Sequence, residues 1–316
     1  MERPHRQSQD FGEIWNIQTD METTQEKWDS IFHNRKEPWK CSGRKKVTGC
    51  KECKEIEHTG IDSKGNSFIV PIIGDLHANL EGLETLYKNN NFYKAIIVGD
   101  LCLYPTIESA KLDTKSYSKN KIAIEKLIQK IKNKQLTALS LETVSLLGNH
   151  DNFPDLNNDL FNKLNITYIK NGTLLEIGNL TIATLGGIYS PVKFNWNTSK
   201  LKEYNKRFYT REDIENLLTA IDSLNKNIDI LITHEAAEGV LPTLPSKTDE
   251  GKKVLSDLLF EVNPKYYIHG HHHKQYEKHL FKKNKYDIEV IGLGNFGTNS
   301  NAFVKFNALT GKRIYT

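Results

Sequence analysis

The sequence lacks any long apolar segment. No apolar run approaches the ~20 residues needed to cross a bilayer, and the first residues, Met1–Gln7, are polar throughout. A secretory leader would need a basic start, an apolar stretch and a small-residue cleavage site, and this pattern does not occur there. We therefore expect a cytoplasmic protein with no membrane partner.

The chain also has little excess charge of either sign. Its formal net charge is +4 over 316 residues, which by itself is too small to predict a nucleic-acid partner. Lysines gather from Lys111 to Lys134 and again at Lys274, Lys278, Lys282, Lys283 and Lys285. A solvated lysine face is the default explanation for both groups. Attraction of a polyanionic substrate is the alternative for the second group.

Cysteine is scarce, and three of the four cysteines lie early in the chain. Residues 1–66 are polar and show no strand alternation, so we expect an N-terminal extension followed by a principal domain at 67–316. Within the extension, four nitrogen and sulfur groups fall in eighteen residues: Cys41, Cys50, Cys53 and His58. They could form a small structural zinc site that orders this segment. Reduced free thiols or a weakly ordered tail are the alternatives. The fourth cysteine, Cys102, is expected to be a buried core thiol rather than a nucleophile.

What the chain does contain is a set of five short segments rich in histidine and aspartate, in a fixed order. They are Gly74–Asn79 (GDLHAN), Gly99–Leu101 (GDL), Gly148–Asp151 (GNHD), Thr233–Glu235 (THE) and Gly270–His273 (GHHH). A single GD or GH dipeptide occurs by chance in most chains, whereas five such segments in order are specific. Together they indicate a two-metal centre that cleaves a phosphoester.

Short apolar runs precede four of these segments: Phe68–Ile73, Ala95–Val98, Val144–Leu147 and Ile228–Ile232. Such runs are typical of buried strands, and open α/β sheets place their sites at the carboxyl ends of strands. Helical stripes lie between the runs, at Leu80/Leu83/Leu86/Tyr87, Ile124/Leu127/Ile128/Ile131 and Ile214/Leu217/Leu218/Ile221, the last after a start signal from Thr210 to Asp213. The runs Ile288–Gly294 and Ala302–Phe306 are expected to be antiparallel strands that finish the sheets. The pattern predicts a layered α/β domain.

The ordered segments resemble the signature of the calcineurin-like metallophosphoesterase superfamily, D-x-H, GD, GNH[DE], H and GHxH, over roughly residues 68–300. The resemblance implies a β-sandwich flanked by α-helices and two divalent ions that activate a hydroxide for in-line attack on phosphorus. It assigns Asp75, His77, Asp100 and His273 to the first ion, with Asp100 as the bridge, and Asn149, His234 and His271 to the second. Mixed imidazole, carboxylate and amide ligands suit Mn, Fe or Zn better than Mg.

The same resemblance assigns His150 a catalytic role in which it does not bind metal. It would protonate the leaving alkoxide or stabilise the charge of the transition state, while Asp151 orients its imidazole and raises its pKa.

Two further features bear on the substrate. Protein serine/threonine phosphatases have GDxxDRG at the second motif, and the Gly99–Pro105 stretch has no such arginine. The stretch Leu185–Ser190, followed by Arg207–Ile214 and Thr233–Glu235, resembles the middle of RNA lariat debranching enzymes and their prokaryotic relatives. Candidate substrate contacts are Asn79, Tyr104, Tyr189, Arg207 and His272, the tyrosines as stacking faces.

These observations favour a binuclear-metal phosphodiesterase acting on a nucleotide or nucleic acid. The alternative within enzymes is a phosphomonoesterase acting on a small molecule or a phosphoprotein. The alternative outside enzymes is a metal-binding interaction scaffold on the same fold.

Overall fold

The computed structural model describes residues 59–61, 65–104, 106–133, 135, 137–151, 159–224, 226–242, 250–282 and 286–315. The predicted zinc ligands, Cys41, Cys50, Cys53 and His58, lie outside these residues, as do Lys283 and Lys285. No helix in the described part of the chain is long and apolar enough to cross a membrane.

The first sheet consists of β1 (Ile69–Ile73), β2 (Ala95–Ile97), β3 (Thr143–Ser145), β4 (Ile166–Tyr168), β11 (Phe303–Asn307) and β12 (Lys312–Ile314). Their order across the sheet is β12-β11-β1-β2-β3-β4. The four strands from β1 to β4 run parallel, and β11 is antiparallel to both β1 and β12. Three of the predicted apolar runs therefore become adjacent parallel strands, so the segments that follow them emerge at one edge.

The second sheet consists of β5 (Thr173–Ile177), β6 (Leu180–Leu185), β7 (Ile230–Thr233), β8 (Tyr266–His269), β9 (Tyr276–Lys282) and β10 (Tyr286–Gly292), in the order β5-β6-β7-β8-β10-β9. The inner four run parallel, and β5 and β9 are antiparallel edges. The two predicted late strands thus finish different sheets: β10 pairs with β9 and β8, whereas β11 joins the first sheet.

The two sheets pack against each other. The ring of Tyr266 in β8 meets that of Phe306 in β11 edge to face, with centroids 4.9 Å apart. At the end of the chain, Arg313 in β12 pairs with Glu289 in β10 and Glu277 in β9. These contacts join side chains of opposite sheets, which is the arrangement of a sandwich.

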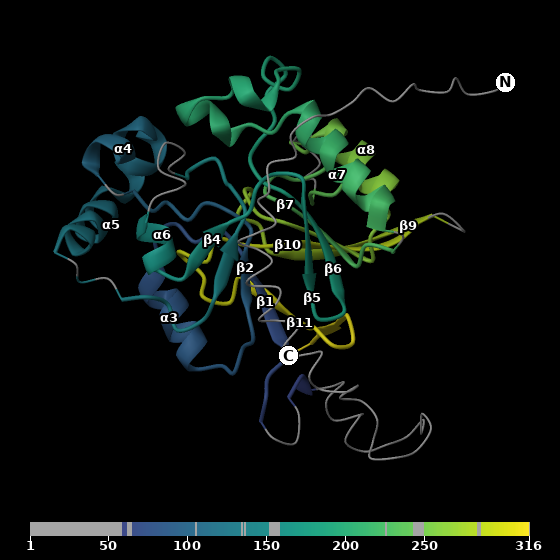
Figure 1. Ribbon diagram of the computed structural model, residues 1–316, viewed down its shortest axis with the longest axis horizontal. Helices are drawn as coiled ribbons and strands as arrows, with labels where there is room; N and C mark the ends of the chain where they lie inside the picture. The colour runs from purple at the N-terminus through teal and green to yellow at the C-terminus, as the bar shows by residue number, and fades with distance from the viewer. Residues whose placement is uncertain are drawn as a thin grey trace. The chain divides into compact units, whose positions relative to one another are not determined.

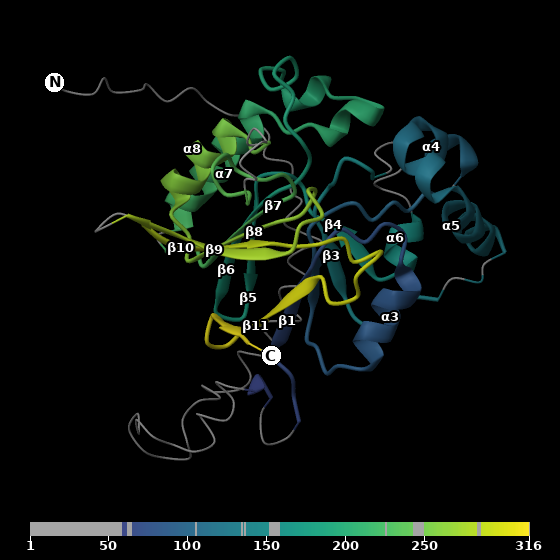
Figure 2. The ribbon, with the colours of Figure 1, turned by 180° about the vertical axis from the view of Figure 1, so that it is seen from behind.

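Helices cover the outer faces of the sandwich (Figures 1 and 2). On the side of the first sheet lie α3 (Leu80–Lys88), α4 (Ile107–Leu112), α5 (Thr114–Lys132) and α6 (Asp159–Lys163); on the side of the second lie α7 (Arg211–Leu224) and α8 (Lys253–Val262). Two 3₁₀ turns, η2 (Thr198–Lys200) and η3 (Glu203–Arg207), lie in the long connection between β6 and α7. The predicted α/β sandwich flanked by helices is confirmed.

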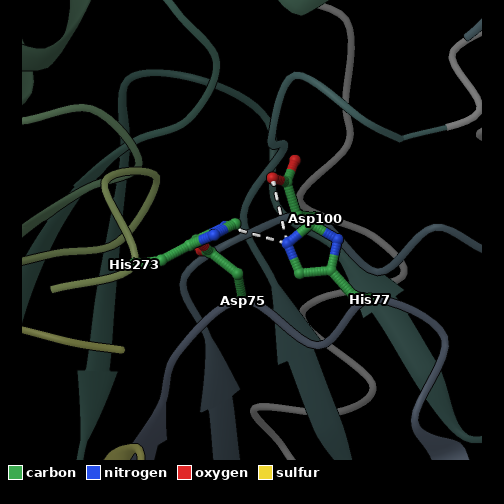
Figure 3. Close-up of side chains that lie close together, drawn as sticks. All are labelled: Asp75, His77, Asp100 and His273. Carbon is green, nitrogen blue, oxygen red and sulfur yellow. Dashed lines mark hydrogen bonds and ion pairs between the residues drawn. The ribbon is translucent and has the colours of Figure 1, made fainter. Parts of the chain in front are cut away.

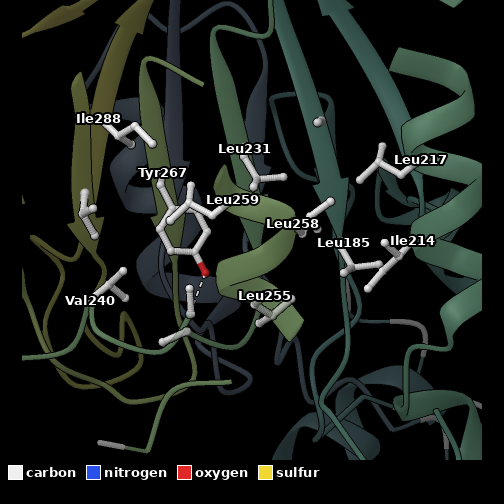
Figure 4. Packing of buried hydrophobic residues seen from close by; sticks show 14 of the residues in the cluster. Leu185, Ile214, Leu217, Leu231, Val240, Leu255, Leu258, Leu259, Tyr267 and Ile288 are labelled. Atoms are coloured by element: carbon white, nitrogen blue, oxygen red, sulfur yellow. Dashed lines mark hydrogen bonds between the residues drawn. The ribbon is translucent and has the colours of Figure 1, made fainter. Parts of the chain in front are cut away.

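The predicted apolar stripes form the cores beneath these helices. Leu83 of α3 and Leu127 of α5 are buried in one cluster with Ile97 of β2. Leu217 of α7 is buried in a second cluster. The helix α8 packs on the same sheet and contributes Leu255, Leu258 and Leu259 to this cluster (Figure 4). Because each stripe supplies apolar surface to a sheet, helix and strand stabilise each other.

The predicted start signal of α7 forms a reciprocal capping box. The backbone N–H of Thr210 donates to Asp213 Oδ2 at 2.7 Å, and the backbone N–H of Asp213 donates to Thr210 Oγ1 at 3.2 Å. Both side chains are buried, so the first turn of α7 has its orphan donors satisfied inside the protein.

Candidate metal centre and active site

The predicted ligands follow the carboxyl ends of five strands. Asp75 and His77 follow β1, Asp100 follows β2, Asn149 follows β3, His234 follows β7, and His271 and His273 follow β8. The first three strands belong to one sheet and the last two to the other. Packing of the two sheets therefore brings together polar side chains that are up to about 200 residues apart in the chain.

A first group consists of Asp75, His77, Asp100 and His273, with one ligand atom of each within 4.8 Å of the others. His77 lies between His273 and Asp100 (Figure 3), with its Nε2 2.9 Å from His273 Nε2 and 3.9 Å from Asp100 Oδ2. His273 Nε2 lies 3.2 Å from Asp75 Oδ2. Four donor atoms therefore converge on one position.

A second group shares Asp100 and adds His234 and His271, again within 4.8 Å. His234 Nε2 lies 3.5 Å from Asp100 Oδ1 and 3.1 Å from the side-chain oxygen of Asn149. On the other side of the ring, His234 Nδ1 donates to the Val98 carbonyl at 3.0 Å. This bond occupies Nδ1, so that Nε2 points into the group, the orientation in which an imidazole binds a metal.

The donor set fits divalent ions. Among the described side chains, the buried oxygens Asp75 Oδ1 and Asp100 Oδ2 have no hydrogen-bond partner. A buried carboxylate oxygen without a partner is costly, and a cation bound by these two carboxylates would satisfy both oxygens. The membership of Asp100 in both groups suits a carboxylate bridge between two ions.

The imidazoles of both groups include rings that stay neutral, the form that binds metal. Burial and the neighbouring His234 together lower the pKa of His271 to about 2. Burial also lowers the pKa of His77. Burial opposes ionisation of Asp100, but the nearby His234 and His150 outweigh it and hold the pKa of that carboxyl well below its usual range.

Steric contacts explain why glycine occupies two positions in the motifs. A Cβ on Gly148 would lie 2.1 Å from Asp100 Oδ1, and a Cβ on Gly99 would lie 2.6 Å from His234 Nδ1. Gly99 also has φ +128°, which only glycine adopts without strain. These residues let the backbone approach the ligands of a neighbouring strand.

His150 lies next to the first group on its more open side. Its ring centroid is 5.8 Å from that of His77, and its side chain is 20% exposed, compared with 1% for Asp100. Its Nδ1 donates to Asp113 Oδ2 at 2.5 Å. Burial acts against the charge on His150, but the bond to Asp113 and the charge of Asp100 outweigh it and raise its pKa.

The structure assigns the orienting contact to Asp113, between α4 and α5, and not to Asp151 as expected from the sequence. Asp151 instead accepts the backbone N–H groups of Gly148 at 2.7 Å and Cys102 at 3.1 Å. It therefore ties the third motif to the second. Burial and the charge of Asp100 raise the pKa of Asp151 to about 7.

Asp113 was missed because nothing in its sequence context marks it. It lies in the lysine-rich segment after the second motif and outside all five motifs. Tyr104 adds a second contact: its hydroxyl lies 2.9 Å from Asp113 Oδ2 and 2.7 Å from the His150 carbonyl. The prediction that Tyr104 offers a stacking face is wrong, since the residue is 1% exposed and its hydroxyl supports His150.

The other candidate substrate contacts lie at different places around the groups. Asn79 caps α3 through its Oδ1, which accepts the Gly82 N–H at 3.0 Å. His272 adjoins both predicted ligands of its motif, and its ring lies 4.9 Å from that of His271. Tyr189 packs with Phe194 at 5.3 Å between ring centroids.

Tyr189 and Arg207 belong to the connection between β6 and α7, which is anchored at the site. Its Gly187 N–H donates to the Leu147 carbonyl at 2.5 Å, just before the third motif, and the Tyr189 N–H donates to Glu235 Oε2 at 2.7 Å. A backbone bridge between Ile188 and Phe208 brings Arg207 close to the same point. This connection therefore borders the second group.

The lysines that follow His273 divide into two kinds among those described. Lys278 donates to the Gly239 carbonyl at 2.7 Å, so it holds a loop. Lys274 is exposed. Lys278 therefore makes a structural contact, whereas Lys274 lies in solvent.

The sandwich thus carries two adjoining groups of possible metal ligands that share the carboxylate of Asp100. The chain belongs to the calcineurin-like phosphoesterase family, whose model matches residues 70–275. This match covers more than half of the sequence and all seven predicted ligands.

The chain is also similar to a lariat debranching enzyme from Schizosaccharomyces pombe, with 26% identity over 160 residues. The match covers 44% of this chain and 34% of that enzyme, so the chain corresponds to about a third of the length of that relative. The two resemblances inferred from the motifs are confirmed.

Solved structures with a similar arrangement include the protein TT1561 from Thermus thermophilus, with a TM-score of 0.46 and 14% identity, covering 78% of this chain and 96% of that one. Another is the calcineurin-like phosphoesterase YfkN from Bacillus subtilis, with a TM-score of 0.38 and 14% identity, covering 73% of this chain and 82% of that one.

Proposed function

We propose that this chain is a two-metal phosphodiesterase acting on a nucleotide or nucleic acid. The observation that carries the proposal is the convergence of two ligand groups on Asp100 with His150 beside them. A scaffold that had lost its metals would have no reason to keep the carboxylate oxygens Asp75 Oδ1 and Asp100 Oδ2 buried without a hydrogen-bond partner.

In this proposal Asp75, His77, Asp100 and His273 hold one ion, and Asp100, Asn149, His234 and His271 hold the other. Mn, Fe or Zn suits this mixture of ligands. When bound, the two ions would activate a water nucleophile and neutralise charge on the phosphoryl oxygens.

His150 supplies the proton. Asp113 holds Nδ1, which leaves Nε2 for the substrate. Against the opposing effect of burial, the bond to Asp113 raises the pKa of the ring and so favours its protonated form. A charged Nε2–H next to the phosphoryl group can donate to the departing oxygen or stabilise its developing charge. Asp113 and Tyr104 fix the direction of that donation.

The preference for a diester follows from what surrounds the groups. A diester carries one negative charge at phosphorus where a monoester dianion carries two, so it needs less local clamping. No arginine follows Asp100 in the second motif. The flanking groups of a diester must be held elsewhere, and Arg207, Tyr189, Asn79 and His272 are the candidates on this chain.

The similarity to a lariat debranching enzyme supports a nucleic-acid substrate, with a 2′-5′ branch as one member of the class to be tested. The connection between β6 and α7, with the first residue of α7, also combines cations with aromatic rings. Lys193 Nζ lies 3.4 Å from the Trp196 ring centroid, and the Arg211 guanidinium lies 5.1 Å from that of Phe194. Cations and aromatic rings are the usual means of holding a single strand.

The experiment is a substrate panel with the Mn²⁺-loaded protein: a bis-aryl phosphodiester, the matching mono-aryl ester, linear RNA and 2′-5′-branched RNA. We expect the diesters to be cleaved faster, and cleavage of RNA to slow as salt rises. Arg207→Ala should raise KM for RNA more than it lowers kcat. Lys226→Ala removes an equal charge from a residue paired with Glu176 and is the control. A strong monoesterase preference with no salt dependence would instead favour a small-molecule phosphatase.

A further inference from the structure

We infer that Cys102 is a positioning residue for the first metal group, through a hydrogen bond from His77 Nδ1 to its sulfur. The inference rests on the proposed metal-dependent function. It gives the buried thiol, which the catalytic scheme leaves unused, a defined task.

The side chains of Cys102 and His77 are in contact. Cys102 Sγ lies 3.4 Å from His77 Nδ1, within the range of a hydrogen bond to sulfur. The other ring nitrogen of His77 faces His273 Nε2 at 2.9 Å and the unpartnered Asp100 Oδ2 at 3.9 Å. That orphaned oxygen marks the position of a cation independently of the cysteine. His77 is therefore held from behind by sulfur while its front nitrogen points at the ion.

The backbone explains why these two side chains meet. The loop after β1 runs beside the loop after β2, with the His77 N–H donating to the Asp100 carbonyl at 2.8 Å and the Ala78 N–H to the Leu101 carbonyl at 3.0 Å. The Cys102 N–H donates to Asp151 Oδ1. Three motifs thus fix the cysteine against the ring of His77.

The backbone conformation of Cys102 is unusual for a residue with a side chain. Cys102 has φ +54°, in the left-handed region that glycine and asparagine adopt more readily than other residues. If only the turn mattered, glycine would suit this position better. A side chain that is retained in such a conformation and is 1% exposed is explained by the contact it makes.

The two metal groups then differ in how their histidines are held. His234 donates its Nδ1–H to a backbone carbonyl, the usual kind of partner for a metal-binding imidazole. His77 donates to a thiol, which is a weaker acceptor. A neutral thiol fixes the His77 ring without adding a negative charge. The negative charge of the first group then comes from its two carboxylates, Asp75 and Asp100.

The test is a calorimetric titration of the metal-free full chain with Mn²⁺. The unsubstituted chain should bind two ions, and Cys102→Ala should bind one of them roughly 10- to 100-fold more weakly, as is typical when the partner of a ligand is lost. Cys102→Ser keeps an acceptor at this position and should recover most of the affinity. Ile128→Val removes a methylene from the same buried cluster and should leave both affinities unchanged.

A second readout needs no substitution at Cys102. In nitrogen NMR spectra of the Zn²⁺-loaded chain, the His77 resonances, identified with His77→Asn, should show a protonated Nδ1 and a metal-bound Nε2. The opposite tautomer would overturn the inference. So would two wild-type affinities in Cys102→Ala, or equal losses in Cys102→Ala, Cys102→Ser and Ile128→Val, which would indicate packing alone. If the unsubstituted chain binds no metal, the proposed function itself fails.

Discussion

The charge on Asp113 should matter to catalysis although Asp113 lies behind His150 and away from the predicted ligands. Its Oδ2 is 2.5 Å from His150 Nδ1, and its side chain is 3% exposed. In Asp113→Asn the amide can still hydrogen bond, but the negative charge that stabilises the imidazolium is lost. Hydrogen bonds to charged groups contribute roughly 1.5–3 kcal/mol, which corresponds to about a 10- to 160-fold loss in kcat/KM.

The assay compares diesters that differ only in leaving group. If Asp113 acts through the proton of His150, the loss should be large for an alkyl or phenyl leaving group and small for nitrophenolate, which departs without a proton. Metal content measured by elemental analysis should stay at that of the unsubstituted chain.

Tyr104→Phe is the matched control, because it removes the hydroxyl that contacts Asp113 and the His150 carbonyl but keeps the carboxylate. The hydroxyl has one proton, and its nearer acceptor is the His150 carbonyl at 2.7 Å. Loss of that neutral hydrogen bond, about 1 kcal/mol, should slow the reaction by about fivefold with the same dependence on leaving group. Equal losses for good and poor leaving groups in Asp113→Asn would refute the reasoning and leave Asp113 a structural residue.

Three further outcomes are expected. His150→Ala should keep its metal content by elemental analysis and lose roughly 10²–10⁴-fold in rate on poor leaving groups; loss of metal would instead make His150 a ligand. Gly148→Ala should lose metal and activity together, because the new Cβ would lie 2.1 Å from Asp100 Oδ1; full metal content in a folded variant would contradict this. Thr210→Ala should lower the free energy of unfolding by about 0.5–2 kcal/mol through loss of the α7 cap, measured in urea, with kcat unchanged; a large fall in kcat would give the cap a role at the site.

The fold could be predicted where the sequence pattern is strong. Leu83, Leu127 and Leu217 lie on the buried faces of α3, α5 and α7 because their spacing repeats every three to four residues. The apolar runs before Asp75, Asp100 and His234 became central strands because they are short, β-rich and bounded by glycine or polar residues. What the runs could not reveal is which sheet each joins, since that depends on long-range pairing. Ile288–Gly294 and Ala302–Phe306 are close in sequence yet belong to different sheets.

The site could be predicted to the extent that its residues lie in motifs. The residues expected to bind metal lie close together because each follows the carboxyl end of a strand, and packing of the two sheets brings these ends together. Asp113 could not be predicted, because it reaches His150 from the α4–α5 junction through tertiary packing alone. The same limit produced the incorrect roles for Tyr104 and Asp151: sequence adjacency to a motif does not show whether a side chain faces substrate or backbone. Burial and hydrogen bonding of these two residues decided the question.

The central claim is that two ions share Asp100, and metal titration of the unsubstituted chain and Asp100→Asn tests it most directly. Metal-free protein would receive Mn²⁺ stepwise, with bound metal and cleavage of a bis-aryl diester measured at each addition. Activity of the unsubstituted chain should appear as the second of about two ions binds, and Asp100→Asn should lose both occupancy and turnover because the neutral amide is a poor bridge. Turnover in metal-free protein, or unchanged metal content and rate in Asp100→Asn, would contradict it.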